Sequence, residues 1–110
     1  MGVDVYMKWD GFGERETGNP NYDAQITGFQ DNGKAGYLRI SYSHKNYEEA
    51  VSPFFWEWEK DIKFTIEVIK EFIEIVNAMQ NEDKQEYLDF AELGMKLNKE
   101  GKNPKVHISY

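Results

Sequence analysis

One alternating stretch decides the expected fold: Gly36-Tyr37-Leu38-Arg39-Ile40-Ser41-Tyr42-Ser43-His44. Successive side chains of a β-strand point to opposite faces, so Leu38, Ile40 and Tyr42 share one face and the residues between them share the other. The first set is apolar and can cover a core. The second set brings a cation, an aromatic ring and hydroxyl groups to a face that the core does not need. We therefore expect a half-buried strand with function on its polar face.

Three further segments alternate in the same way and are predicted to be strands: 2–9, 22–29 and 105–110. Asn32-Gly33 supplies the positive φ angles of a tight hairpin, so strands 22–29 and 36–44 are expected to pair antiparallel. Residues 10–21 are rich in glycine and charge, which predicts a long loop after the first strand.

Two helices are predicted before the last strand. Ser52-Pro53 is a favoured start for a helix, and apolar residues then recur every three or four positions as far as Gln80. Asn81 can cap a second helix that stops at Gly101. The second helix has a narrower apolar stripe, in which Gly94 allows a close crossing: Tyr87, Phe90, Ala91, Gly94 and Leu97. The wider apolar surface of the first helix predicts a homo-oligomer that forms through it.

These elements predict a single α+β domain that spans residues 1–110. Its antiparallel sheet of about four strands has the order βββ-αα-β, with two helices packed on one face. The apolar residues at 3, 5, 7, 38, 40, 106 and 108 should then lie under the helices.

Composition limits the function. A net charge of −7 disfavours binding to duplex nucleic acid. The chain has no cysteine, which excludes disulfides, thiolate catalysis and Cys-ligated zinc. No stretch approaches the length of a membrane span, so we expect a cytoplasmic protein with no membrane partner.

The polar face of the expected sheet is the candidate site. It collects Tyr6, Lys8, Gln25, Thr27, Tyr37, Arg39, Ser41, Lys105 and His107. Within this set, cationic, aromatic and hydrogen-bonding groups suit a small anionic ligand with a flat ring, such as a nucleotide. We assign charge recognition to Arg39, Lys8 and Lys105, ring stacking to Tyr6 and Tyr37, and hydrogen bonds to Ser41 and His107. A solvated sheet face that needs no ligand, or one that packs against a second copy, is the plainer interpretation.

Other chemistry has weaker signals, and no catalytic residue, cofactor or metal site is assigned. His44 and His107 have no recognised metal spacing, and no nucleophile motif is present. The acidic residues of the first helix, Asp61 among them, are interleaved with lysines and are expected on its solvated side. Two alternatives stay open: an acidic interaction protein that blocks a basic host protein, and a small hydrolase that uses one of the histidines with a carboxylate.

A resemblance rests on three segments: Gly2-Val3-Asp4-Val5-Tyr6-Met7-Lys8-Trp9, Gln25-Ile26-Thr27-Gly28-Phe29 and Gly36-Tyr37-Leu38-Arg39. They resemble short uncharacterised bacterial and phage proteins. The resemblance covers about the first 45 residues and brings no established activity or site with it. What it implies is a phage-type anti-defence role, either by sequestering a nucleotide signal or by blocking a host protein.

Overall fold

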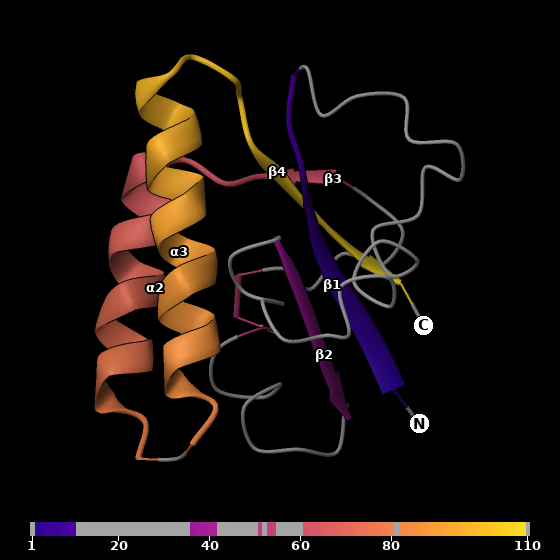
Figure 1. Cartoon of the computed structure of the whole chain (residues 1–110), viewed down its shortest axis with the longest axis vertical. Helices are drawn as coiled ribbons and strands as arrows, with labels where there is room; N and C mark the ends of the chain where they lie inside the picture. The colour runs from indigo at the N-terminus through magenta and orange to yellow at the C-terminus, as the bar shows by residue number, and fades with distance from the viewer. Residues whose placement is uncertain are drawn as a thin grey trace.

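The computed structural model describes residues 2–10, 36–41, 51, 53–54, 61–80 and 82–109, without the side chains of 2–4, 39–41 and 109. Within this part, four antiparallel strands form one sheet in the order β2-β1-β4-β3, and two helices lie beside it (Figure 1). The elements are β1 (Gly2–Lys8), β2 (Tyr37–Ser41), β3 (Asp61–Lys63), α2 (Ile66–Ala78), α3 (Lys84–Lys99) and β4 (Lys105–Ser109). The predicted α+β class and the βββ-αα-β order are confirmed, although one of the three strands before the helices is β3, which the sequence assigned to the first helix.

The register puts the expected apolar residues on one face. Val5 of β1 pairs with Leu38 of β2 and with Ile108 of β4. Met7 pairs with Val106 in the same way. All five side chains are buried. Residues that pair across antiparallel strands point to the same face, so odd positions of β1 and even positions of β2 and β4 together form the floor of the core.

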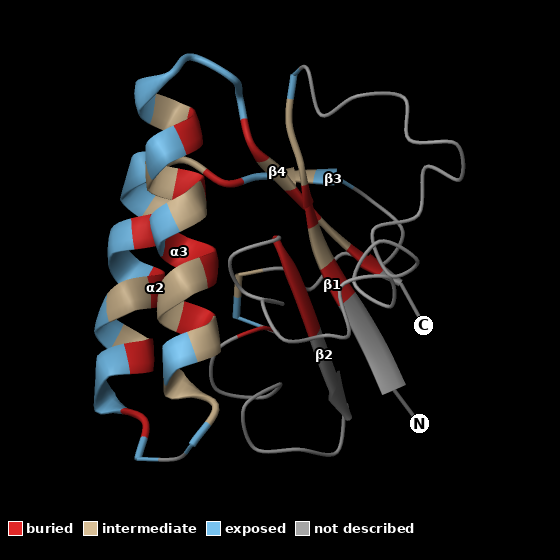
Figure 2. Ribbon diagram, viewed as in Figure 1, coloured by how far each residue is buried: buried red, intermediate tan, exposed pale blue. Residues whose placement is uncertain are grey.

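The two helices cover this floor. The buried residues of both helices lie on the sides of the ribbons that face the sheet, while the opposite sides of both helices are exposed (Figure 2). Phe72 of α2 and Phe90 of α3 meet in the centre with a ring-centroid distance of 6.2 Å. Phe64, in the link between β3 and α2, lies 5.8 Å from the Phe72 ring and 5.5 Å from the Phe90 ring. An aromatic cluster therefore joins both helices to the sheet edge.

The predicted helix from Ser52 to Gln80 is wrong in its first part. Residues Asp61–Lys63 form strand β3, and α2 begins only at Ile66. Thr65 is the N-cap, and its Oγ1 accepts a hydrogen bond from the Val68 N–H at 3.3 Å. Ile62 fits the helical spacing of the residues that follow it, but pairing with Val106 of β4 places it in the sheet instead. Tertiary strand pairing thus prevailed over the local helical pattern.

The end of the second helix is as expected. Gly101 has φ +72°, a left-handed conformation that glycine adopts without steric cost. Its N–H bonds the Asn98 carbonyl at 3.1 Å, and the Lys102 N–H bonds the Leu97 carbonyl at 2.9 Å. These two bonds make a Schellman motif, so Gly101 stops α3 as predicted. At the other end the predicted cap at Asn81 is wrong, because α3 begins at Lys84 and its N-cap is Asp83, which makes no side-chain cap bond.

Gly94 admits close neighbours from the segment before α2 and from α2 itself. A Cβ atom at Gly94 would lie 2.6 Å from two carbons of the Phe64 ring and 3.1 Å from Ile69 Cδ1. Asn98, one turn further on, donates from Nδ2 to the carbonyl oxygens of Phe64 and Gly94, both at 2.9 Å. Packing and hydrogen bonds therefore fix the segment before α2 against α3.

Several expectations fall outside the described residues: strand 22–29, the hairpin at 31–34, most of the loop 10–21, the Ser52 cap and His44. Among the helices that are described, none has the length and apolar character needed to cross a membrane.

Candidate functional site

The face of the sheet opposite the helices carries two rows of polar residues. In the first row, His107 of β4 pairs with Tyr6 of β1 and with Asp61 of β3. In the second, Lys105 pairs with Lys8 and with Lys63. Neighbouring strands lie about 4.8 Å apart, so each row brings three side chains of adjacent strands together.

The first row is held by its own contacts. His107 Nδ1 lies 2.9 Å from Asp61 Oδ1, and the His107 ring lies 5.0 Å from the Tyr6 ring at an angle of 32°. Lys8 leaves the second row to join this group, with Nζ 3.5 Å from Asp61 Oδ1 and 5.7 Å from the centre of the Tyr6 ring. The positive charge of Lys8 is therefore compensated by Asp61.

Two opposing effects set the pKa of Asp61. Burial tends to raise it, but the hydrogen bond with His107 and the nearby charge of Lys8 outweigh burial, so the pKa lies below its ordinary value. The carboxylate of Asp61 is thus the form that the folded protein favours.

A pH-dependent loss of stability follows for Asp61→Asn. A carboxylate with a lowered pKa in the folded state stabilises the protein above its unfolded pKa of about 3.9, and this contribution disappears as the pH falls through the folded value. Because the Asp61 side chain is 39% exposed, we expect the free energy of unfolding of the wild type to exceed that of the variant by less than about 1 kcal/mol near neutral pH. Urea denaturation across the acid range should show the difference shrink toward zero. A difference that stays constant in acid would contradict the prediction.

The second row opens onto a hollow. Lys63 and Lys105 form no ion pair with any residue that the structure describes. Both line a hollow of about 350 Å³ at the end of the sheet. The other residues that line it lie just after β1, between β3 and α2, near the end of α3 and just before β4: Asp10, Phe64, Thr65, Asn98, Asn103 and Pro104.

The walls of the hollow are anchored by backbone hydrogen bonds. The Phe64 N–H bonds the Pro104 carbonyl at 2.9 Å, and the Asp10 N–H bonds the Lys102 carbonyl at 2.8 Å. Asn103 has φ +48° and donates from Nδ2 to Asp10 Oδ2 at 2.9 Å. The segments after β1, before α2 and before β4 are therefore held together around the hollow independently of any ligand.

This arrangement can bind an anion. Two ammonium groups and the Thr65 hydroxyl are hydrogen-bond donors beside one concave surface. In the described part of the chain, no group of three or more His, Cys, Asp or Glu side chains could hold a metal ion.

The structure brings together four of the seven expected site residues: Tyr6, Lys8, Lys105 and His107. The assignment of ring stacking to Tyr37 is wrong, because this side chain has no exposed surface and so offers no ring face to a ligand. Arg39 and Ser41 lie in β2, but their side chains are not described. Asp61 and Lys63 were missed, since both were assigned to the first helix. The polar–apolar alternation of Asp61-Ile62-Lys63-Phe64 is the signal that could have identified them.

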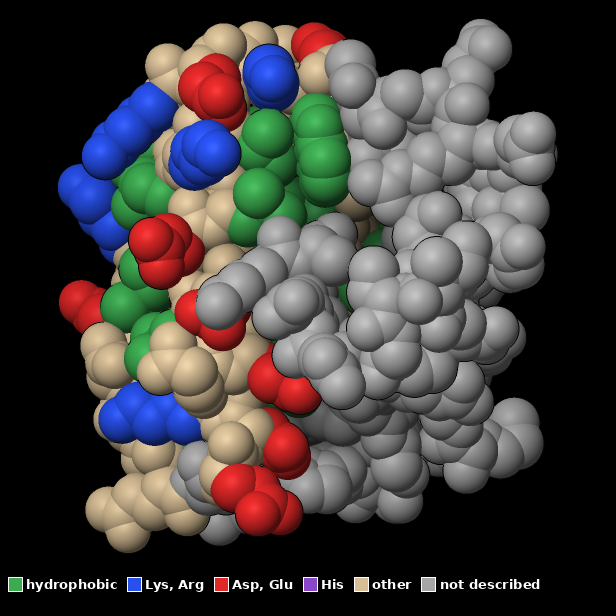
Figure 3. All heavy atoms as spheres, viewed as in Figure 1, with side chains coloured by type: hydrophobic (Ala, Val, Ile, Leu, Met, Phe, Trp, Pro, Cys, Tyr) green, Lys and Arg blue, Asp and Glu red, His purple; other side chains and the backbone are tan. Residues whose placement is uncertain are grey.

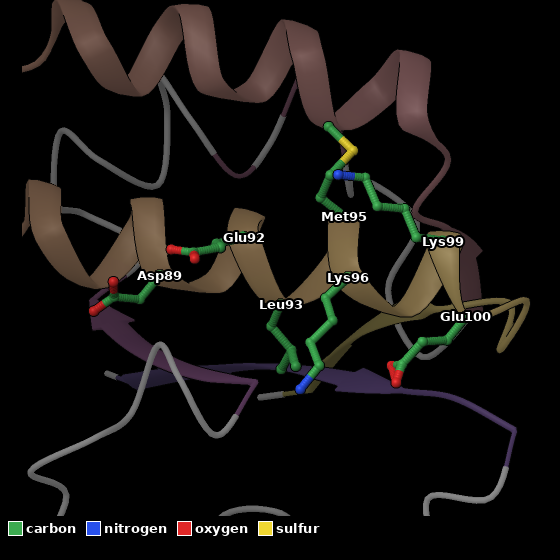
Figure 4. Close-up of a pocket in the computed structure, with 7 residues that line it drawn as sticks. All are labelled: Asp89, Glu92, Leu93, Met95, Lys96, Lys99 and Glu100. Atoms are coloured by element: carbon green, nitrogen blue, oxygen red, sulfur yellow. The ribbon is translucent and has the colours of Figure 1, made fainter.

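A second, larger hollow of about 640 Å³ runs along α3 (Figure 4). Leu93 and Lys96 point toward the sheet, whereas Met95 points toward α2. Both acidic and basic side chains line it: Asp89, Glu92, Glu100, Lys96 and Lys99. Both kinds of charge also lie over the helices on the face in Figure 3, with most Lys and Arg in its upper half. The mixed charge of this hollow favours neither an anion nor a cation.

Comparisons with models of protein families, with curated proteins and with solved structures find no match to this chain.

Proposed function

We propose that this protein is a non-enzymatic binding protein that holds a small anionic, nucleotide-like ligand in the hollow beside Lys63 and Lys105. One observation supports the proposal most directly: two neighbouring lysines of a chain with net charge −7 form no ion pair with a described residue and line the same hollow. Like charges at opposite positions of adjacent strands destabilise a sheet. An anion that binds between them would remove this repulsion and stabilise the folded state.

The phosphate of such a ligand, not its ring, is the group that we place in the hollow. Tyr37 is buried, and the Tyr6 ring is already in contact with His107 and Lys8. The expected stacking on these tyrosines is therefore not part of the proposal. A protein that holds the ligand without changing it would lower its free concentration, which is the sequestering role that the resemblance implies.

Replacing both Lys63 and Lys105 with alanine is expected to weaken binding of AMP or inorganic phosphate at least about tenfold, since a hydrogen bond to a charged group contributes about 1.5–3 kcal/mol. Isothermal titration calorimetry at low salt measures the effect. Lys70→Ala is the matched control, because Lys70 is an exposed lysine of α2 outside the hollow.

The free energy of unfolding of the double variant and of Lys70→Ala shows whether Lys63 and Lys105 serve binding or stabilise the fold. Because the lysines repel each other, the double variant should be at least as stable as the wild type without ligand. If neither AMP nor phosphate binds the wild type, or if the double variant and Lys70→Ala bind equally, the proposal fails.

Two observations weigh against the alternatives. Asp61 and His107 form a hydrogen-bonded pair of the kind that supports a general base, but neither residue lines the hollow. For the acidic interaction protein, the relevant feature is a cluster of three acidic residues near the start of α3: Asp83, Glu86 and Asp89. Burial and the charges of Asp83 and Asp89 raise the pKa of Glu86. Lysines are interspersed with acids along the described helices, so this surface has no uniform acidic stripe for a basic partner.

A further inference from the structure

We infer that the hollow binds a phosphate ester that carries hydroxyl groups close to its phosphate. A sugar phosphate and the ribose phosphate of a nucleotide are ligands of this class. Asp10 accepts the hydrogen bonds of those hydroxyl groups. The inference rests on the proposed function and specifies the chemical class of its ligand.

The inference rests on the position of Asp10 in the hollow. Its carboxylate lines the same hollow as Lys63 and Lys105, although a carboxylate is an unfavourable neighbour for an anion. The side chain is fixed in place, because its Oδ2 accepts from Asn103 Nδ2 at 2.9 Å. The backbone is fixed as well, through the bond from the Asp10 N–H to the Lys102 carbonyl at 2.8 Å. Asp10 therefore belongs to the wall of the hollow.

The chemistry of the wall selects the ligand. A carboxylate is an acceptor only, with about four lone-pair sites on its two oxygens, and one hydrogen bond with a described side chain occupies Asp10. Beside a bare phosphate, the remaining sites would only repel. A ligand whose hydroxyls reach Asp10 converts this repulsion into charge-assisted hydrogen bonds. The two lysines and the Thr65 hydroxyl are left as donors for the phosphate.

The test compares two esters, one with hydroxyl groups and one without. Calorimetric titration of the wild-type protein with ribose 5-phosphate and with n-propyl phosphate should show a preference of at least about tenfold for the sugar phosphate. Asp10→Asn should bring the two affinities within about twofold of each other, mainly by removing the charge that repels propyl phosphate. Glu100→Gln is the control, since it removes an exposed carboxylate that lies outside this hollow and should keep the preference.

The outcomes separate this inference from the proposed function. Equal affinities for the two esters in the wild type, or a full preference in Asp10→Asn, overturn the inference and leave the anion site in place. If inorganic phosphate and both esters fail to bind the wild type, the proposed function falls, and the inference falls with it. Should Asp10→Asn fold poorly, Asp10→Ser gives the same comparison.

Discussion

Replacing Phe72 with alanine is expected to lower the free energy of unfolding by about 3–5 kcal/mol. The Phe72 side chain is fully buried and lies at the centre of the aromatic cluster. Its ring centre is 5.8 Å from that of Phe54, 5.8 Å from that of Phe64 and 6.3 Å from that of Tyr87. Truncation would remove the contacts between α2, α3 and the β3–α2 link together, and the surrounding rings can fill the space only in part.

Urea denaturation followed by circular dichroism measures this loss. Glu71→Ala is the matched control, because it changes the preceding, exposed residue of the same helix and should alter stability by less than about 0.5 kcal/mol. A loss below about 1 kcal/mol for Phe72→Ala would mean that the aromatic cluster does not stabilise the fold.

Replacing Gly94 with valine should lower the free energy of unfolding by about 3 kcal/mol. Helix propensity would favour the change by a few tenths of a kcal/mol, because glycine is the poorer helix former. Steric overlap acts in the other direction and is larger, since even a Cβ atom would lie 2.6 Å from the Phe64 ring. Phe64 is fully buried, so its ring cannot move aside into solvent.

A double-mutant cycle with Phe64→Leu tests the cause of this loss. Leucine removes the ring atoms that oppose the new side chain, so the double variant should lose less than the sum of the single variants, with a coupling of about 1 kcal/mol or more. Met95→Val controls for placing a β-branched residue in α3. Strict additivity of the Gly94 and Phe64 substitutions would show that the overlap is not the cause.

Local patterns were sufficient for much of the fold. The alternation of residues 2–8 and 105–109 predicted both strands and the face that each buries, because period two fixes which side chains enter the core once one side is covered. Gly101 ended the second helix as expected, because the left-handed position after a helix is one that glycine fills without strain.

Residues 61–63 could not be assigned in this way. Ile62 is four residues before Ile66, which fits a helix, and two residues before Phe64, which fits a strand. The sequence therefore supports both the helical and the strand periodicity. Pairing with β4 decides in favour of the strand, and β4 is separated from these residues by both helices, α2 and α3. The alternation of residues 61–64 is a signal for the strand, but only the pairing with β4 decides between the strand and the helix.

The candidate site was affected by the same ambiguity. Tyr6, Lys8, Lys105 and His107 were placed together from the register of two strands. Asp61 and Lys63, which complete the two rows, depend on the position of β3. The burial of Tyr37 was also beyond reach, since strand alternation gives the face of a residue and not what covers that face.

The strand order β2-β1-β4-β3 has a consequence for synthesis on the ribosome. In the described sheet, β3 has only β4 as its hydrogen-bonded neighbour, so its three residues must wait unpaired while both helices are translated. Lys63 and Lys105 become neighbours only when β4 emerges and inserts between β1 and β3. The proposed anion site would therefore form only in that step, so binding of phosphate by a nascent chain would report that β4 has inserted.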